Sequence, residues 1–465
     1  MSEVFQKAVR SVQRAVVRTI VGGAVVVGSL EVATHLPSEG RSSVLYHALV
    51  DDWVVPAMRR LLGPEDAHKI ALKIAVLAPT HRPSAKEQRL NVAVRLWGKH
   101  NNTSTKLFSN PIGLAAGYDK DGTAIFPLMA MGFGFVEVGS VCLKAQPGNP
   151  SPRMFRLVED EAIINRYGFN SMGADAVEEH MKEYRSNKSS LKSPSSSQTS
   201  WEEKIYNFLW PGANDGKLSG LLGINLGKNK TSDTPLEDYQ KLILQLGPYA
   251  DYLVINVSCP NISGLRDLQN TDSLEGLLKG CQNACLQLAE NKIGKPKPQP
   301  PLLVKLSPDL TNSELEGIAT VLMKLGIDGI ILTNTTTSRN NLSSLNKVEN
   351  GGLSGKPLKE RSTECIRLLY RFTKGTIPII GVGGVQNGRD AYEKFKAGAS
   401  LVQVYSGMIY EGPGMVSKVR DELAELMLQN GQRDLQTEVI GIDHDDLIFR
   451  RKRLHQEKAM MTWLN

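Results

Sequence analysis

The chain has 465 residues and a formal net charge of +7, with five cysteines and an ordinary hydrophobic share of 41%. That length suits two or three average domains or one large α/β barrel with additions. The basic excess is modest and no recognition motif accompanies it, so nucleic acid is not expected as a partner. Five cysteines do not make a disulfide framework. No second pair or histidine follows Cys281 and Cys285 at zinc spacing, so no metal is expected.

The first part of the chain carries a targeting pattern. Residues 1–18 hold four basic residues and one acidic residue with apolar residues between them, which predicts a mitochondrial targeting segment. An uncharged stretch rich in Val and Gly follows, and residues 19–36 are expected to form one membrane anchor, with a short apolar centre. A secretory signal is the alternative, disfavoured by the long basic stretch and the missing cleavage site.

Residues 44–80 predict a helical hairpin. Its helices are expected at Val44–Leu62 and Glu65–Leu77, because Gly63-Pro64 separates two apolar segments and Pro79 ends the second. The pair is unusually apolar. It either packs on the main domain or dips into a bilayer beside the anchor.

Residues 81–430 contain a repeat that predicts an α/β fold. Eight short apolar runs alternate with segments able to form helices, such as 235–246, 311–325, 358–373 and 388–397. The pattern favours a (β/α)8 TIM barrel over a doubly wound sheet, which rarely needs eight strands that all end in polar residues. The predicted strands are Ile112–Ala116, Phe135–Val138, Leu221–Asn225, Leu253–Val257, Leu302–Leu306, Gly329–Leu332, Ile377–Gly381 and Leu401–Val404.

Two other segments have the composition of surface chain. Residues 186–200 are nearly all Ser, Lys, Thr, Gln and Pro, which predicts a disordered insertion without chemistry. Residues 431–465 form a C-terminal tail with a basic run near its end. That run is solvated or contacts anionic lipid.

The segment Asp251–Arg266 shows how polar groups collect where a predicted strand ends. An apolar run stops at Asn256, and Ser258, Cys259 and Asn261 surround the break at Pro260. Such residues also occur in ordinary turns. In a barrel, however, the C-terminal strand ends carry the working groups, and the other predicted strands end in a similar way.

The residue types at these ends suit a planar, anionic ligand. Gly383-Gly384 and the turn at Tyr405-Ser406 would expose backbone N–H groups after strands seven and eight, where such barrels bind phosphate. A buried Lys305 would either face an anion, such as a reduced flavin, or shift its pKa. Five asparagines offer donors and acceptors to a pyrimidine dione or a flavin ring, although any one of them could be a turn residue. They are Asn165, Asn225, Asn256, Asn261 and Asn334.

From about Val44 to Leu426 the chain resembles the dihydroorotate dehydrogenases, and its N-terminal region resembles their membrane-bound, quinone-using class 2. The motifs that carry the resemblance are Ala115–Lys120, Val136–Val141, Asn165–Ser171, Gly223–Lys230, Asn256–Arg266, Thr333–Thr335, Gly351–Leu358 and Gly381–Val385. The resemblance implies oxidation of dihydroorotate to orotate in de novo pyrimidine biosynthesis, with FMN as hydride acceptor and ubiquinone as final electron acceptor. It also implies an enzyme in the mitochondrial inner membrane, held by a single pass, with the catalytic domain facing the intermembrane space and no obligate protein partner.

Site residues follow from the same resemblance. Cys259 stands at the position of the catalytic base, and Lys305 is the second catalytic residue. The substrate site would comprise Lys120, Asn165, Arg166, Tyr167, Gly168, Phe169, Asn256, Asn261, Asn334 and Thr335. FMN would contact Ala115, Ala116, Gly117, Ser140, Asn165, Asn225, Asn256, Lys305, Thr333, Ser354, Gly355, Gly383, Gly384, Tyr405 and Ser406. The quinone tunnel would hold Arg59, His68 and Arg156, with Arg59 standing where relatives have Gln.

Cys259 departs from the class, which usually has Ser there, and Ile262 replaces the usual Thr. A free thiol has a pKa of about 8.5, far below that of an alcohol, so activity is expected to extend to lower pH than in a serine-type relative. Because the soluble class has Cys, a soluble-type enzyme that uses fumarate or NAD is one alternative. A non-catalytic, membrane-tethered barrel is another. A third is a pyrimidine reductase related to the dihydrouridine synthases, which the missing basic recognition domain disfavours.

Overall fold

The computed structural model describes residues 47, 49–78, 81, 83–98, 103–190, 220–290 and 298–444. The predicted targeting segment, the predicted anchor, residues 191–200 of the predicted insertion and most of the tail lie outside these residues. Within them, no helix combines the length and the apolar character needed to cross a membrane.

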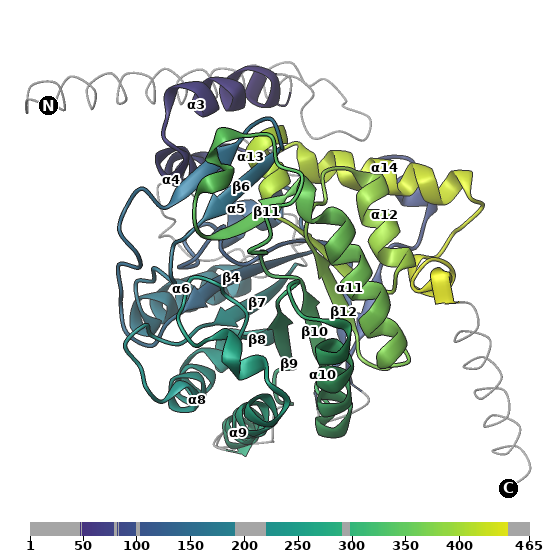
Figure 1. Ribbon diagram of the computed structural model, residues 1–465. Coiled ribbons are helices and arrows are strands. Elements are labelled where there is room, and N and C mark those ends of the chain that lie inside the picture. The colour runs from purple at the N-terminus through teal and green to yellow at the C-terminus, as the bar shows by residue number, and fades with distance from the viewer. Residues whose placement is uncertain are drawn as a thin grey trace, which may run out of the picture.

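Eight parallel strands close into a barrel in the order in which they occur along the chain, so the predicted TIM-barrel fold is confirmed (Figure 1). Closure comes from the pairing of the last strand with the first, with Val402 beside Ile112. The strands are β3 (Ile112–Leu114), β4 (Phe135–Val141), β7 (Leu221–Leu226), β8 (Tyr252–Asn256), β9 (Leu302–Leu306), β10 (Gly329–Leu332), β12 (Ile379–Val382) and β13 (Leu401–Val404).

Helices surround the barrel, as the crossover segments predicted. The clearest start signal is at α10, where Thr311 and Glu314 form a reciprocal capping box and Gly326 ends the helix in the left-handed conformation. Residues 186–190 belong to α6, so that part of the predicted insertion is helical. The helices are α5 (Ile125–Ala130), α6 (Ala174–Ser190), α8 (Pro235–Leu246), α9 (Thr271–Glu290), α10 (Asn312–Leu325), α11 (Lys359–Phe372), α12 (Gly388–Lys396), α13 (Ser406–Glu411), α14 (Met415–Gln429) and α15 (Leu435–Glu438).

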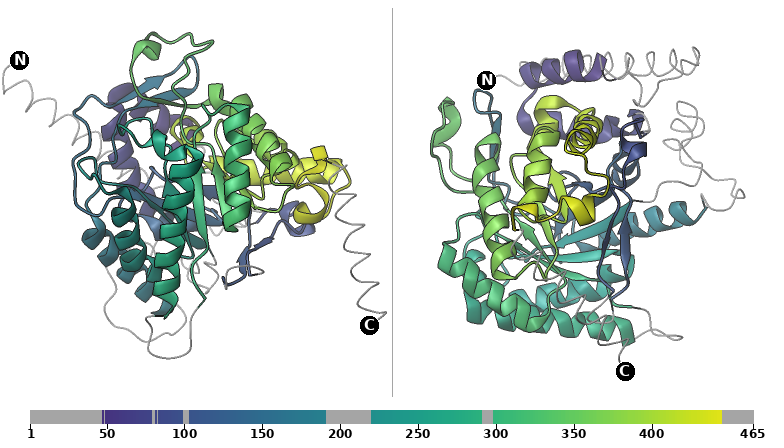
Figure 2. Two further views of the ribbon diagram at one scale, coloured as in Figure 1. Left: turned by 60° about the horizontal axis from the view of Figure 1, so that its bottom comes forward. Right: turned by 90° about the vertical axis from the view of Figure 1, so that its right-hand side faces the viewer.

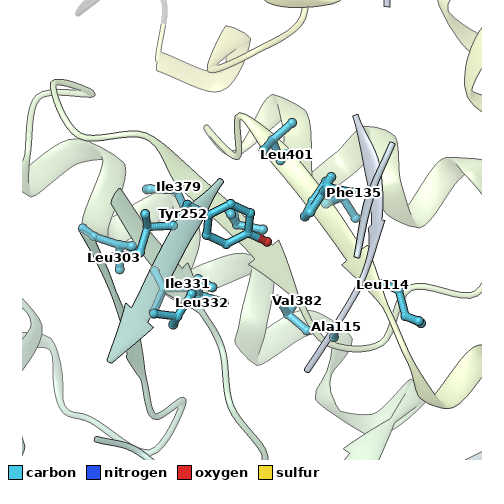
Figure 3. Packing of buried hydrophobic residues seen from close by; sticks show 14 of the residues in the cluster. Leu114, Ala115, Phe135, Tyr252, Leu303, Ile331, Leu332, Ile379, Val382 and Leu401 are labelled. Atoms are coloured by element: carbon cyan, nitrogen blue, oxygen red, sulfur yellow. The ribbon is translucent and has the colours of Figure 1, made fainter. Parts of the chain in front are cut away.

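Side chains from the strands fill the barrel interior and form one continuous core (Figure 3). Two large aromatic side chains occupy space left by glycines on neighbouring strands. A Cβ at Gly113 would lie 2.3 Å from the Phe135 ring, and one at Gly223 would lie 2.1 Å from the Tyr252 ring. Aromatic side chains therefore fill the barrel interior near the N-terminal ends of these strands.

An antiparallel pair, β1 (Val94–Leu96) and β2 (Lys106–Phe108), lies by the N-terminal ends of the strands. Trp97 donates from its indole N–H to the carbonyl of Asp328, just before β10, at 2.8 Å. Its ring meets Phe108 edge to face. Through these contacts, aromatic side chains cover the end of the barrel where the strands begin.

The opposite end carries two further parts (Figures 1 and 2). One is the helical hairpin, formed by the π-helix η1 (Val50–Val54), α3 (Val55–Leu61), α4 (Pro64–Ile74) and the 3-10 turn η2 (Ala75–Leu77). The other is an antiparallel sheet of β5 (Met154–Leu157), β6 (Ala162–Asn165) and β11 (Gly352–Gly355). The sheet was not predicted. Its strands have four residues each, too few to show a clear alternation.

Candidate active site

A cavity opens where the C-terminal ends of the barrel strands converge, and it encloses about 1080 Å³ with its mouth included. We call it the strand-end cavity. Nearly all the predicted substrate and cofactor residues line it, although they are distant in sequence. They are Ala115, Ala116, Gly117, Lys120, Ser140, Asn165, Tyr167, Gly168, Phe169, Asn256, Cys259, Asn261, Lys305, Thr333, Asn334, Thr335, Ser354, Gly355, Gly383, Gly384, Tyr405 and Ser406.

Two predicted residues do not line the cavity. Arg166 turns away: its guanidinium pairs with Glu349 at 2.6 Å and covers the Phe155 ring. Arg166 follows β6 and is therefore tied to the chain before β11, and its assignment to the substrate site stays a prediction. Asn225 is fully buried, and its side-chain oxygen accepts a hydrogen bond from Ser140, which lines the cavity.

A chain of hydrogen bonds joins the floor of the cavity. The Asn225 amide donates to Glu137 at 2.8 Å, while its oxygen accepts from the hydroxyl of Ser140. Asn256 donates to Ser140 at 2.9 Å, and Asn334 donates to the Asn256 oxygen at 3.2 Å. The amides are thus oriented by one another before any ligand binds.

Three buried polar atoms of residues that line the cavity have no hydrogen-bond partner within the described residues: Asn170 Oδ1, Thr333 Oγ1 and Gln403 Oε1. Buried polar atoms in native proteins are nearly always satisfied, so these atoms indicate a bound polar ligand or water. Asn170 and Gln403 were not predicted. The signal for Gln403 was available, since it is the single polar residue in the β13 sequence Leu-Val-Gln-Val.

Cys259 follows β8 and lines the cavity, with only 8% of its surface exposed. It packs in a small apolar cluster with Phe169, Ile262 and Leu265 among its members. Burial raises the pKa of its thiol to about 11, against the opposing effects of hydrogen bonding from Asn261 and of the charges on Arg266 and Lys305. Burial thus places the pKa of this thiol above that of a free thiol, while the comparison with a serine-type relative stays a prediction.

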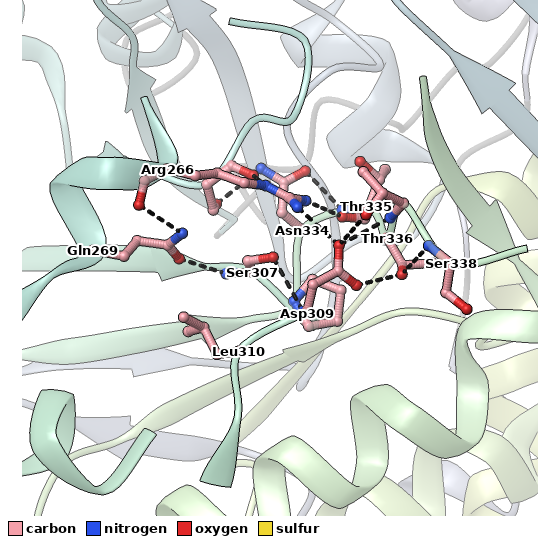
Figure 4. Close-up of polar contacts among 12 residues, drawn as sticks. Arg266, Gln269, Ser307, Asp309, Leu310, Asn334, Thr335, Thr336 and Ser338 are labelled. Carbon is pink, nitrogen blue, oxygen red and sulfur yellow. Dashed lines mark hydrogen bonds and ion pairs between the residues drawn. The ribbon is translucent and has the colours of Figure 1, made fainter. Parts of the chain in front are cut away.

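Arg266 ties the Cys259 loop to the loops after β9 and β10 (Figure 4). Its guanidinium pairs with Asp309 at 2.8 Å and donates to the carbonyls of Ser258 at 3.3 Å and Thr335 at 3.2 Å. Asp309 also accepts from the N–H of Thr337 at 2.9 Å. A single cation thus holds three strand-end loops in register, including the one that carries the thiol.

Two lysines bring positive charge to the cavity. Lys305 lies on β9 and is buried, and burial lowers its pKa while Glu137 and Cys259 oppose the shift. Lys120 follows β3 and lies over the Tyr167 ring, with its ammonium 4.1 Å from the ring centre. Burial lowers the pKa of Lys120 to about 8. Both sites favour an anionic partner, because an anion would offset the cost of burying the charge.

The turn after β12 brings backbone to the cavity wall. Gly384 has φ +69°, and a Cβ there would lie 2.5 Å from the backbone of Lys359. Gly383 has φ +125°, with Ser362 2.9 Å from its Cβ position. Only glycine fits this turn, which leaves a backbone-lined recess at the position where α/β barrels bind phosphate. Together with the unpartnered polar atoms, this recess fits a flavin with a phosphate group.

A second cavity of about 730 Å³ lies beneath the hairpin, and we call it the hairpin cavity. Its walls are mostly apolar, with Val54, Met58 and Ile74 among them. Arg59, His68 and Arg156 line it, as predicted for the tunnel. It is therefore an apolar cavity with a few polar groups, which suits a ligand with an apolar body and a polar head.

Two polar atoms in the hairpin cavity lack a partner within the described part of the chain: His68 Nδ1 and Arg156 Nε. His68 Nε2 lies 2.8 Å from the carbonyl of Tyr118, and burial lowers the pKa of the ring to about 3, so the imidazole is neutral. Arg156 donates to the carbonyls of Arg59 and Leu62, both at 2.9 Å. Its Nε–H remains available to a carbonyl oxygen.

Aromatic rings connect the two cavities. The ring of Tyr118, in the wall of the hairpin cavity, meets His68 at 4.9 Å and Tyr405 at 5.7 Å, both edge to face. Tyr405 lines the strand-end cavity. Only a layer of packed side chains therefore separates a ligand in one cavity from a ligand in the other.

Fold and site together define an α/β barrel with separate cavities for a polar and an apolar ligand. The dihydroorotate dehydrogenase family model matches residues 100–427. The mitochondrial dihydroorotate dehydrogenase (quinone) of Mus musculus is 45% identical over 395 residues, covering 84% of this chain and 90% of the mouse protein. The quinone enzyme of Rhodospirillum rubrum is 41% identical, covering 85% and 96%.

Among solved structures, that of Eimeria tenella DHODH in complex with ferulenol is similar with a TM-score of 0.73 and 38% identity, covering 84% of this chain and 99% of that one. The chain belongs to the dihydroorotate dehydrogenase family. The resemblance to the quinone-dependent class 2 is thereby confirmed, because the relatives that match over most of their length carry that name.

Proposed function

We propose that this protein oxidises dihydroorotate to orotate for pyrimidine biosynthesis, with FMN in the strand-end cavity and a quinone such as ubiquinone in the hairpin cavity. The observation that carries the proposal is the pairing of a polar and an apolar cavity across the His68–Tyr118–Tyr405 contacts. One chain then serves a polar reductant and a lipid-soluble oxidant, which need different surroundings.

Cys259 is the catalytic base of the proposal. Its thiolate would take the proton from C5 of the substrate, and a bound FMN would supply the acceptor for the hydride from C6. Asn256, Asn261 and Asn334 line the same cavity and offer both donors and acceptors to the ring amides. Lys120 would face the substrate carboxylate, which supports its positive charge.

Other residues of the cavity would hold the flavin. The Gly383-Gly384 turn, Ser406 and Gly355 would surround its phosphate, and Thr333 Oγ1 and Gln403 Oε1 offer unused hydrogen-bonding atoms. Lys305 would stabilise negative charge on the flavin, because its buried ammonium makes no hydrogen bond with the described residues. The other predicted flavin contacts that line the cavity keep their proposed roles, and Asn225 would orient Ser140 from beneath.

The proposal extends to the whole chain. Residues 1–18 would direct it to mitochondria and residues 19–36 would anchor it as a single pass in the inner membrane, with the catalytic domain in the intermembrane space. The hairpin of residues 44–80 would admit the quinone. Support comes from the mouse and Arabidopsis thaliana relatives, both named as mitochondrial, the latter being 44% identical over 393 residues.

A visible spectrum tests the proposal most simply. The purified full chain should be yellow, bleach with dihydroorotate under nitrogen, and regain colour with a ubiquinone analogue. Recovery with fumarate or NAD in place of the quinone would favour the soluble-type alternative. A colourless protein that binds no flavin would favour a non-catalytic barrel, and bleaching by other reductants but not by dihydroorotate would point to another pyrimidine substrate.

A further inference from the structure

The most exposed large apolar side chains of the described residues gather at one end of the molecule. Ten such side chains are exposed, and the five with the largest exposed fractions come from the hairpin, the β5–β6 turn and the 3-10 turn η6 (Leu345–Val348). They are Leu345 (92%), Val348 (81%), Trp53 (74%), Leu61 (63%) and Val158 (58%). We call these five residues the end patch.

Hydrogen bonds join the segments that carry Leu61, Val158 and Leu345. Arg156 donates to the carbonyl of Leu62, next to Leu61, while its own carbonyl accepts from Asn346, next to Leu345, at 2.9 Å. The β5–β6 turn meets the same loop, because Asp160 accepts from the N–H groups of Ser343 and Ser344 at 2.8 and 3.0 Å. Three segments distant in sequence are thus fastened side by side.

The figures show the same arrangement. The β10–β11 loop and the β5–β6 hairpin project together at the end of the molecule that carries α3 (Figure 2). Exposed charges of both signs flank the patch residues in sequence: Arg60 and Lys347 beside Leu61 and Val348, and Asp52 and Glu159 beside Trp53 and Val158. A tryptophan and aliphatic side chains with charged neighbours are typical of a surface that meets lipid headgroups.

We propose that the end patch seats the catalytic domain on a bilayer, so that η6 and the β5–β6 turn contact lipid together with the hairpin. This goes beyond the proposed function, in which the anchor and the hairpin alone meet the membrane. A bilayer is inferred as the partner because the segment that precedes the hairpin in sequence contains an uncharged, mostly apolar stretch at residues 20–30. Contacts on both sides of Arg156 would fix the hairpin cavity relative to the lipid.

Site-directed fluorescence in membranes tests this inference. All five native cysteines are buried, so a thiol-reactive dye can be placed at Leu345→Cys or Val348→Cys, with the unsubstituted chain as the labelling blank. Leu286→Cys on α9 and Met323→Cys on α10 are matched controls, because they also expose apolar side chains but lie on helices far from α3 (Figure 1). The full chain is reconstituted into phosphatidylcholine–phosphatidylglycerol vesicles with and without doxyl-labelled phosphatidylcholine.

Dyes at 345 and 348 should be quenched by the doxyl lipid at least about twofold more than dyes at 286 and 323, because interfacial side chains lie at headgroup depth. Equal quenching at all four positions would overturn the proposal. Shielding of 345 and 348 that rises with protein concentration but not with doxyl lipid would also overturn it, since a second copy would then cover the patch.

A charge variant gives an independent readout. In Leu345→Glu/Val348→Glu, electron transfer to a long-chain quinone in the vesicles should slow several-fold, because two acids oppose insertion. Bleaching by dihydroorotate should be unchanged, and Leu286→Glu/Met323→Glu should resemble the parent. If the charge variant reduced the membrane quinone as fast as the unsubstituted protein does, the proposal would be contradicted. If the unsubstituted protein did not bleach with dihydroorotate, the proposed function would be refuted instead, and the quenching result would still test the membrane contact.

Discussion

The strand-end cavity and the hairpin cavity differ in their lining: the first is rich in hydrogen-bonding groups and the second is mostly apolar. In the first, polar groups come from almost every barrel strand and hydrogen-bond to one another, as the Ser140–Asn225–Asn256–Asn334 chain shows. In the second, apolar walls surround a few polar groups, two of which keep an unpartnered atom. A cavity of the first kind discriminates by hydrogen bonding, and one of the second kind accepts ligands by shape. Substitutions should therefore cost more in the first cavity.

The largest effect is expected at Cys259. Cys259→Ala removes the base, and the rate of substrate oxidation should fall by about 10²–10⁴, the usual contribution of general base catalysis. Flavin content should not change, because the side chain lies in a small apolar cluster. Stopped-flow bleaching with dihydroorotate measures the rate. Cys365→Ala, another buried cysteine that does not line the cavity, is the control, and equal rates in the two variants would rule out the role of Cys259.

The pH dependence should also be large. Since only the thiolate accepts a proton and burial raises the thiol pKa to about 11, kcat/KM should rise with pH about tenfold per unit below that value in the free enzyme. Charge on a bound substrate shifts the midpoint of the kcat profile, not that of kcat/KM. Cys259→Ser should move the rising limb to higher pH. A profile identical in both proteins would show that residue 259 does not titrate in the reaction.

In the hairpin cavity we expect a smaller effect. Arg156→Met removes the unpartnered Nε–H and should raise the KM for a quinone analogue about tenfold, since a hydrogen bond from a charged donor contributes about 1.5–3 kcal/mol. The KM for dihydroorotate should stay the same. Arg60→Met, at an exposed position on the hairpin helix α3, is the control, because it removes a guanidinium that does not line the cavity. A raised dihydroorotate KM in Arg156→Met would mean that the two cavities are not independent.

The smallest effect is expected at Arg266, which joins the Cys259 loop to the loops after β9 and β10. Arg266→Met releases the Cys259 loop from Asp309 and Thr335 and removes a charge that lowers the thiol pKa. Bleaching should slow about fivefold, because one partly buried ion pair that positions the loop is lost. The pH profile should move to higher pH. Asp309→Asn should slow bleaching with less change in the profile. An unshifted profile in Arg266→Met would reduce the residue to a purely structural role.

The sequence carried the barrel and most of the site because strands buried on both faces read as continuous apolar runs with polar ends. It failed where partners distant in sequence decide the outcome. Arg166 does not line the strand-end cavity, because it pairs with Glu349, which is distant in sequence. The pKa of Cys259 depends on the side chains that bury it, which no local pattern reveals. The sheet of β5, β6 and β11 was missed because its strands are short. The exposure of Leu345 in η6 could not be predicted, because it depends on the folded arrangement of the chain.

The central claim, that each cavity serves one half of the reaction, is tested most directly by stopped-flow measurement of both halves in two variants. Cys259→Ala should slow bleaching by dihydroorotate and leave recovery with a quinone analogue unchanged. Arg156→Met should slow recovery at subsaturating quinone and leave bleaching unchanged. If both substitutions slowed the same half, the two cavities would not divide the reaction between them, and the central claim would be wrong.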